Sequence, residues 1–198
     1  IDSGVWSEAH GDHAHHYAAK PRERDLALPS GTSYHAVSDD ERSVVWFDTD
    51  GSFASFDWKG LADDDLQIDV HETTSPHHGV AVPLPGGGFL TSVADGDHAS
   101  GVAVLDQSGK ETQRFEDCHG LHGEAHAAEG AFAFGCEDGV MVYQDDAVRN
   151  IESPVDGTGT GTLAGSHESD VVAGDLSGED GAGATQIALY NVKTGEAK

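Results

Sequence analysis

Short runs of strand-forming residues recur along this chain of 198 residues, and turns rich in Gly and Asp separate them. Residues 44–47 (VVWF) lead into 52–56 (SFASF) across Asp50-Gly51, a pair that is a strong signal for a β-hairpin. Residues 131–136 lead in the same way into 139–143. No stretch shows a convincing amphipathic helical period, so we expect an all-β fold.

The runs are grouped into units of about 40 residues, which begin near Tyr34, His78, Leu121 and Thr160. Residues 101–104 (GVAV) and 139–142 (GVMV) occupy the same place in successive units. A period of this length with four strands per unit is typical of β-propeller blades. A β-sandwich with similarly spaced hairpins is the alternative, and the repetition favours the propeller.

The ends of the chain do not coincide with unit boundaries. We expect a single propeller domain over residues 1–198, with about three full blades over 33–157 and a partial blade on each side. Residues 1–28 are interpreted as the third and fourth strands of a blade with a histidine-rich insertion between them, and 160–192 as three strands of the last unit. Such a set does not close a typical ring, so we expect a fragment of a larger propeller.

The chain carries 36 acidic against 10 basic residues, a formal net charge of −26. This charge repels phosphate backbones and anionic membrane surfaces and attracts cations, so nucleic acid is not expected as a partner. The alternative role of the charge is solubility or adaptation to salt. No apolar run approaches about 18 residues, so membrane insertion is not expected.

Thirteen histidines are present, and four of them lie within seven residues in the segment HGDHAHH (10–16). Imidazole and carboxylate together suit a divalent transition metal, zinc first. As a flexible loop with Gly11 and Ala14, the segment can wrap a tetrahedral ion. The alternative is a solvated polar loop that binds nothing.

A second group of histidines recurs at one position of the repeating unit. His77 and His78 precede a first strand, His122 holds the same place in the next unit, and His35 holds it in the previous one. Because the first strands of a propeller line its central channel, these imidazoles can converge at the channel mouth. The alternative is that each caps its own strand. The weaker candidates are His71, His98, His119, His126 and His167.

Cys118 and Cys136 are the two cysteines. They lie at neighbouring ends of a predicted hairpin, which favours a disulfide, while free thiols or zinc ligation together with His119 or His122 remain alternatives. Motifs of hydrolases such as G-x-S-x-G and H-E-x-x-H are not found, and no catalytic residue is predicted.

Three segments resemble the AztD family of periplasmic zinc metallochaperones: PHHGVAVP (76–83), CHGLHG (118–123) and FGCEDG (134–139). The resemblance implies a secreted β-propeller that binds zinc and passes it to the solute-binding protein of a zinc ABC transporter. It also implies metal binding by His10, His13, His77, His78 and His122, and a disulfide between Cys118 and Cys136.

Taken together, these patterns predict a periplasmic or otherwise extracytoplasmic zinc-binding protein that is not an enzyme. The alternatives are a metal-dependent propeller hydrolase or lactonase, and a propeller scaffold whose histidines bind no metal. The predicted zinc ligands are His10, His13, His15, His16, His77, His78 and His122.

Overall fold

The computed structural model describes residues 3–23, 27–28, 31–33, 35–39, 42–57, 60, 66–73, 75–96, 98–178, 184 and 186–198. These residues form strands β1 to β19 and a single turn of 3-10 helix at Ala128–Gly130. Within them, no helix is long and apolar enough to cross a membrane. The all-β prediction is confirmed.

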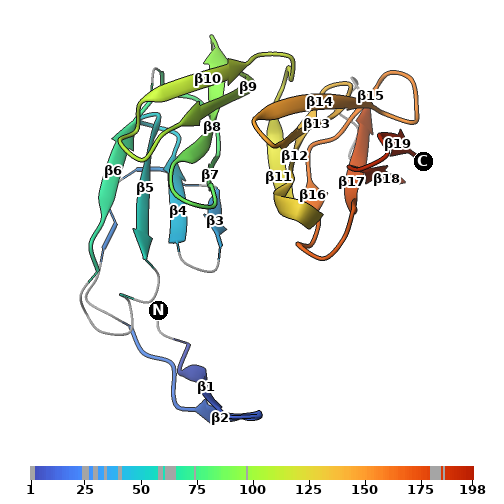
Figure 1. Cartoon of the computed structure of the whole chain (residues 1–198). Coiled ribbons are helices and arrows are strands. Elements are labelled where there is room, and N and C mark those ends of the chain that lie inside the picture. Colours follow the sequence, from blue (N-terminus) through green and yellow to red (C-terminus); the bar gives the residue numbers. More distant parts are fainter. Residues whose placement is uncertain are drawn as a thin grey trace.

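Four antiparallel sheets follow one another in chain order (Figure 1). The first sheet contains β3 (Ala36–Ser38), β4 (Arg42–Phe47), β5 (Ser52–Asp57) and β6 (Asp69–Glu72). The second contains β7 (Ala81–Pro83), β8 (Phe89–Asp95), β9 (His98–Leu105) and β10 (Glu111–Phe115). Their first strands begin close to the predicted unit starts at Tyr34 and His78.

The third sheet contains β11 (His122–His126), β12 (Phe132–Cys136), β13 (Gly139–Gln144) and β14 (Ala147–Glu152). In the fourth, β15 (Thr158–Gly159) and β16 (Leu163–Ala164) both pair with β17 (Val171–Gly178), which is followed by β18 (Gln186–Asn191) and β19 (Glu196–Ala197). The prediction of three strands in this last unit missed β19, which pairs with the end of β18.

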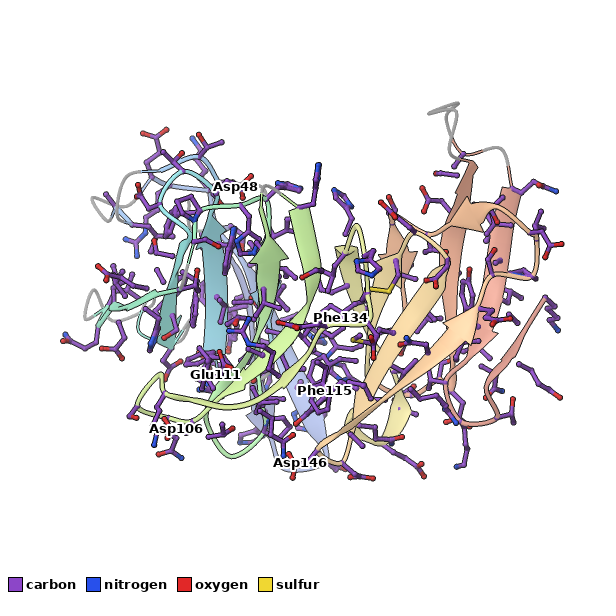
Figure 2. All side chains as sticks on the ribbon, turned by 90° about the horizontal axis from the view of Figure 1, so that it is seen from above. Asp48, Asp106, Glu111, Phe115, Phe134 and Asp146 are labelled. Carbon is purple, nitrogen blue, oxygen red and sulfur yellow. A yellow bond between two sulfur atoms is a disulfide. The ribbon has the colours of Figure 1, made fainter. Side chains whose placement is uncertain are left out.

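The hydrophobic core is divided among the junctions between successive sheets, as in a stack of propeller blades (Figure 2). Trp46 and Phe53 of the first sheet pack with Phe89 of the second, and the Phe53 and Phe89 rings lie 4.9 Å apart. Phe134 fills the next junction and Tyr190 the last. Each such buried side chain contributes about 1.5–3 kcal/mol. Because both faces of a blade are covered, strands such as β12 are buried at every position.

The disulfide between Cys118 and Cys136 is present, with the two Cα atoms 5.1 Å apart and both residues buried. This pairing excludes zinc ligation by either thiol. The bridge joins the segment that leads into β11 to the end of β12. It therefore fixes the start of the third sheet, where His122 is the first residue of β11.

The N-terminal segment forms a separate hairpin that projects away from the four sheets (Figure 1). β1 (Val5–His10) pairs with β2 (His13–Ala18), and every residue of both strands is exposed. The predicted insertion loop is therefore wrong, because the histidines lie in the strands themselves. A two-residue turn explains the difference: Gly11 adopts a φ of 62°, which allows Gly11-Asp12 to close the hairpin directly.

Candidate metal centre

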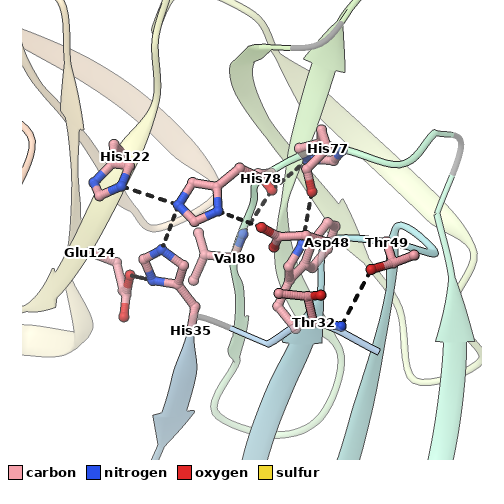
Figure 3. A network of polar contacts seen from close by, with 11 residues as sticks. Thr32, His35, Asp48, Thr49, His77, His78, Val80, His122 and Glu124 are labelled. Carbon is pink, nitrogen blue, oxygen red and sulfur yellow. Dashed lines mark hydrogen bonds and ion pairs between the residues drawn. The ribbon is translucent and has the colours of Figure 1, made fainter. Parts of the chain in front are cut away.

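Three histidines from three successive sheets meet at one end of the first strands (Figure 3). His35 directly precedes β3, His78 lies shortly before β7, and His122 begins β11. The Nε2 atom of His78 lies 3.4 Å from Nε2 of His35 and 3.2 Å from Nε2 of His122. The structure thus brings together residues that are more than 40 positions apart in the sequence.

The opposite ring nitrogen of each imidazole faces an acceptor. His78 Nδ1 lies 2.6 Å from Asp48 Oδ2, and His35 Nδ1 lies 3.3 Å from Glu124 Oε2. His122 Nδ1 lies 2.9 Å from the carbonyl oxygen of Gly161. Carboxylates and carbonyls only accept, so these contacts favour the tautomer with the proton on Nδ1, which leaves Nε2 as the metal-binding nitrogen of a neutral ring.

Nitrogens at these separations of 3.2 and 3.4 Å either share a hydrogen bond or face a common bound cation. With Zn–N distances of about 2.0–2.1 Å and tetrahedral angles, two zinc-bound nitrogens lie about 3.3–3.4 Å apart. The two measured separations fall close to this value. An acceptor that orients the other nitrogen of a ligating histidine is also the usual arrangement around protein-bound metals. This geometry makes the group a candidate transition-metal site with three imidazole ligands.

The charges around this group favour a cation. The carboxylate of Glu124 raises the pKa of His35 by its hydrogen bond and its charge, while burial of the ring opposes this effect. Asp48 supplies a second carboxylate, and its Oδ1 atom is buried without a hydrogen-bond partner among the described residues. The two carboxylates offset the charge of a divalent ion held by neutral imidazoles.

His77 lies outside this group although it is adjacent to His78. Its Nε2 lies 2.8 Å from Ser92 Oγ, its Nδ1 lies 2.9 Å from the Ser75 carbonyl oxygen, and its ring packs against Trp46. Burial lowers the pKa of this imidazole. Both ring nitrogens thus have protein partners, and His77 is placed as part of the packed interior between the first two sheets.

A second histidine group lies on one face of the N-terminal hairpin. His10 pairs directly with His13 across the turn, and His15 follows two residues later on the same face. Their ring centroids are 5.1–5.5 Å apart, and each residue offers a nitrogen within 4.8 Å of the others. The carboxylate of Asp12 lies 3.1 Å from His13 Nδ1. All three of these residues are exposed, whereas His35 and His78 of the other group are partly buried.

His16 points to the other face of the hairpin. Because side chains alternate along a strand, His16 is turned away from His13 and His15. Its Nδ1 lies 2.7 Å from the Oγ atom of Ser7, its partner across the hairpin. Of the four histidines in the segment, His10, His13 and His15 therefore share one face of the hairpin, and His16 lies on the other.

Sequence reasoning missed two further features of the centre at the sheets. His35 is not among the predicted zinc ligands, although its place before a first strand was a signal for it. The carboxylates Asp48 and Glu124 carried no signal, because acidic residues are abundant throughout the sequence and their proximity to histidine exists only in the fold.

Comparison with known proteins identifies relatives by sequence and by structure. No protein-family profile matches the chain. The chain is 32% identical over 146 residues to a protein of Citrobacter koseri named zinc chaperone AztD, with 72% of this chain and 34% of that protein aligned. The chain thus spans about a third of the length of this curated relative.

Solved structures of AztD from Citrobacter koseri resemble the whole chain. The structure of apo AztD superposes with a TM-score of 0.83 at 25% identity, covering 99% of this chain and 54% of that one. A second crystal structure of AztD gives a TM-score of 0.73 at 23% identity, covering 99% and 64%. The four sheets are consecutive blades of the same propeller-like fold.

Proposed function

Because the chain belongs to the AztD family, we propose that it is a zinc metallochaperone: it captures zinc outside the cytoplasm and delivers it to the solute-binding protein of a zinc ABC transporter. The observation that carries this proposal is the meeting of the Nε2 atoms of His35, His78 and His122, each ring with an acceptor opposite its Nδ1. The neutral imidazole is the form of histidine that ligates zinc. Zinc is the cargo of this protein.

The two histidine groups have different tasks in this proposal. The centre at the sheets is held by rigid strands and by partners on every Nδ1, so it is preorganised and retains zinc. The hairpin group of His10, His13 and His15 is exposed on a projecting ribbon, so it exchanges zinc readily and reaches outward. Capture and hand-over therefore belong to the hairpin, and storage belongs to the centre.

The surroundings of the protein fit this role. A net charge of −26 raises the local concentration of divalent cations and favours docking of a more basic partner. The disulfide fits an oxidising compartment such as the periplasm. We take residues 1–198 as part of one propeller domain, in which both histidine groups bind zinc.

Turnover of a substrate is not part of the proposal. A metal-dependent hydrolase needs a carboxylate or histidine that is free to act as a base near the metal. The two carboxylates described next to the centre, Asp48 and Glu124, each face the Nδ1 atom of a histidine. Their role there is to orient and neutralise the site, which favours binding over catalysis.

The test compares two triple variants with the unaltered chain. Zinc stoichiometry by equilibrium dialysis at low free zinc should be two ions per chain. The variants His35→Ala/His78→Ala/His122→Ala and His10→Ala/His13→Ala/His15→Ala should each lose one. The first variant should lose the ion that resists a competing chelator, and the second should lose rapid exchange. His98→Asn, a change at an exposed histidine outside both groups, is the control.

Delivery requires its own measurement. Zinc should pass to the purified solute-binding protein at a rate that rises with acceptor concentration, as expected for direct transfer. A rate that equals spontaneous dissociation, whatever the acceptor concentration, would refute the chaperone function while leaving the zinc sites intact.

A further inference from the structure

Two more histidines meet at the other end of β11. His126 is the last residue of that strand, and His167 lies in the turn between β16 and β17, two strands that pair with each other. Their ring centroids are 4.2 Å apart, at an angle of 47°. Figure 1 shows β16 beside β11, which explains how residues 41 positions apart come together.

This pair is separate from the centre described above. His122 begins β11 and His126 ends it. At about 3.3 Å per residue, the two are about 13 Å apart along the strand. A metal bound at one end therefore cannot contact the ligands at the other end. Because the first strands of neighbouring blades run in the same direction, the pair lies toward the opposite mouth of the channel.

The Nε2 atom of His126 is buried and has no hydrogen-bond partner among the described residues. A buried polar atom left unpaired is destabilising by about 1–3 kcal/mol, and such atoms in native proteins normally have a partner. One face of His126 is closed by Phe132, whose ring centroid lies 4.7 Å away.

The charges around His126 make a metal ion a better partner than a proton for its Nε2 atom. Burial and the neighbouring His167 both lower the pKa of His126, so its ring stays neutral, which is the form that ligates metals. The charges of Asp39 and Glu124 act in the opposite direction, so a negative potential is also present. A neutral imidazole in a negative potential is a good ligand for a divalent ion.

We propose that His126 and His167 form an additional binding site for a divalent transition metal such as Zn²⁺, at the mouth of the channel opposite His35, His78 and His122. Two imidazoles provide two ligands, and water completes the coordination. The site binds metal more weakly than the three-histidine centre, because it has one ligand fewer. It lies outside the metal sites on which the proposed function rests.

The test uses the full chain with one change at a time. His167→Asn alters an exposed turn residue, His126→Asn alters its partner, and His98→Asn is the matched control at another exposed histidine. Zinc bound per chain is measured by equilibrium dialysis up to saturation. Both site variants should bind one zinc ion fewer than the unaltered chain at high free zinc, and the control should bind the same number.

A second measurement locates the ion. Imidazole NMR signals of His126 and His167 should shift together when zinc is added after the tight sites are filled, and neither should shift in the variant lacking the other. The site would be refuted if a folded His167→Asn chain bound as many zinc ions as the unaltered chain. It would also be refuted if zinc did not shift the imidazole signals. Either result leaves tight binding by His35, His78 and His122 untouched, so this failure and a failure of the proposed function are distinguishable.

Discussion

Glu124 Oε2 lies 3.3 Å from Nδ1 of His35, and the two side chains are only 16% and 17% exposed. The carboxylate belongs to β11 and the histidine precedes β3, so the contact ties the third sheet to the first. It also fixes which nitrogen of His35 is left to bind a metal. The contact thus holds the two sheets together and also orients the ring of His35.

Glu124→Gln should weaken zinc binding at the centre by about 10–100-fold, the usual effect of removing a partner of a metal ligand. The amide keeps the shape of the side chain and an acceptor oxygen but removes its charge. Competition with a chromophoric chelator measures the change. Glu129→Gln, at an exposed glutamate that pairs with Lys193, is the control and should have no effect. Equal affinity in the two variants would contradict the role given to Glu124.

His77→Asn and His78→Asn should separate stability from metal binding in two adjacent residues. Loss of His78 should remove tight zinc binding with little change in unfolding. Loss of His77 leaves Ser92 Oγ short of a buried partner and should lower the free energy of unfolding by about 1–3 kcal/mol, with zinc stoichiometry retained. Urea unfolding in the presence of chelator and equilibrium dialysis measure the two effects. The opposite pattern would show that His77 is a ligand.

His15→Ala and His16→Ala test the faces of the hairpin. His15 lies with His10 and His13, so its loss should weaken zinc binding by the hairpin at least tenfold, as for other losses at a metal site. His16 lies on the other face, and its loss should leave that binding unchanged. Both variants are measured in chains that lack the centre at the sheets. A comparable loss from both would mean that the hairpin rearranges to bind metal.

Replacing both Cys118 and Cys136 with Ala should lower the free energy of unfolding by about 3 kcal/mol, the value expected for opening a loop of about this length. The bridge spans 18 residues and both cysteines are buried. Denaturant unfolding of the metal-free protein measures the effect. The same variant should still bind zinc once folded, because neither sulfur is a ligand. Loss of all zinc binding from a folded variant would contradict this.

His71 should make stability depend on pH. Burial lowers the pKa of its ring, which stacks on Phe53 and lies near Ser55 Oγ. The unfolded chain therefore takes up the proton first as the pH falls. The contribution of His71 is complete above its unfolded pKa of about 6.5 and is lost as the pH falls from there through the folded pKa. His71→Gln should flatten the curve of unfolding free energy against pH in that window, measured without metal. An unchanged slope would refute the assignment.

The repeating unit was predictable because its signals are local. Asp50-Gly51 turns a hairpin, and paired runs such as 101–104 and 139–142 mark equivalent strands. The same kind of signal existed at Gly11-Asp12, where a two-residue turn with strand-length flanks indicates a hairpin. The density of histidine there was interpreted as a sign of a loop. The prediction of a loop therefore rested on histidine content, whereas the two-residue turn determines the structure of this segment.

The composition of the centre was only partly predictable, because it depends on side-chain direction. The recurrence of histidine before first strands indicated a meeting point at the channel mouth. It did not distinguish His77 from His78, since adjacent residues in an extended segment point to opposite sides. The partners Asp48 and Glu124 come from other strands and other sheets. Only the assembled blades show which acidic residues reach the histidines.

The wide sequence separation of the three histidines also sets when the centre forms during folding. His35 and His78 are 43 residues apart, and His78 and His122 are 44 apart, so each pair closes a long loop. Such contacts form late, after the hairpins within each sheet. If zinc binds at this centre as proposed, it should act on the docked blades: it should slow their unfolding and leave the rate of folding nearly unchanged. The zinc-loaded chain should thus unfold more slowly than the zinc-free chain.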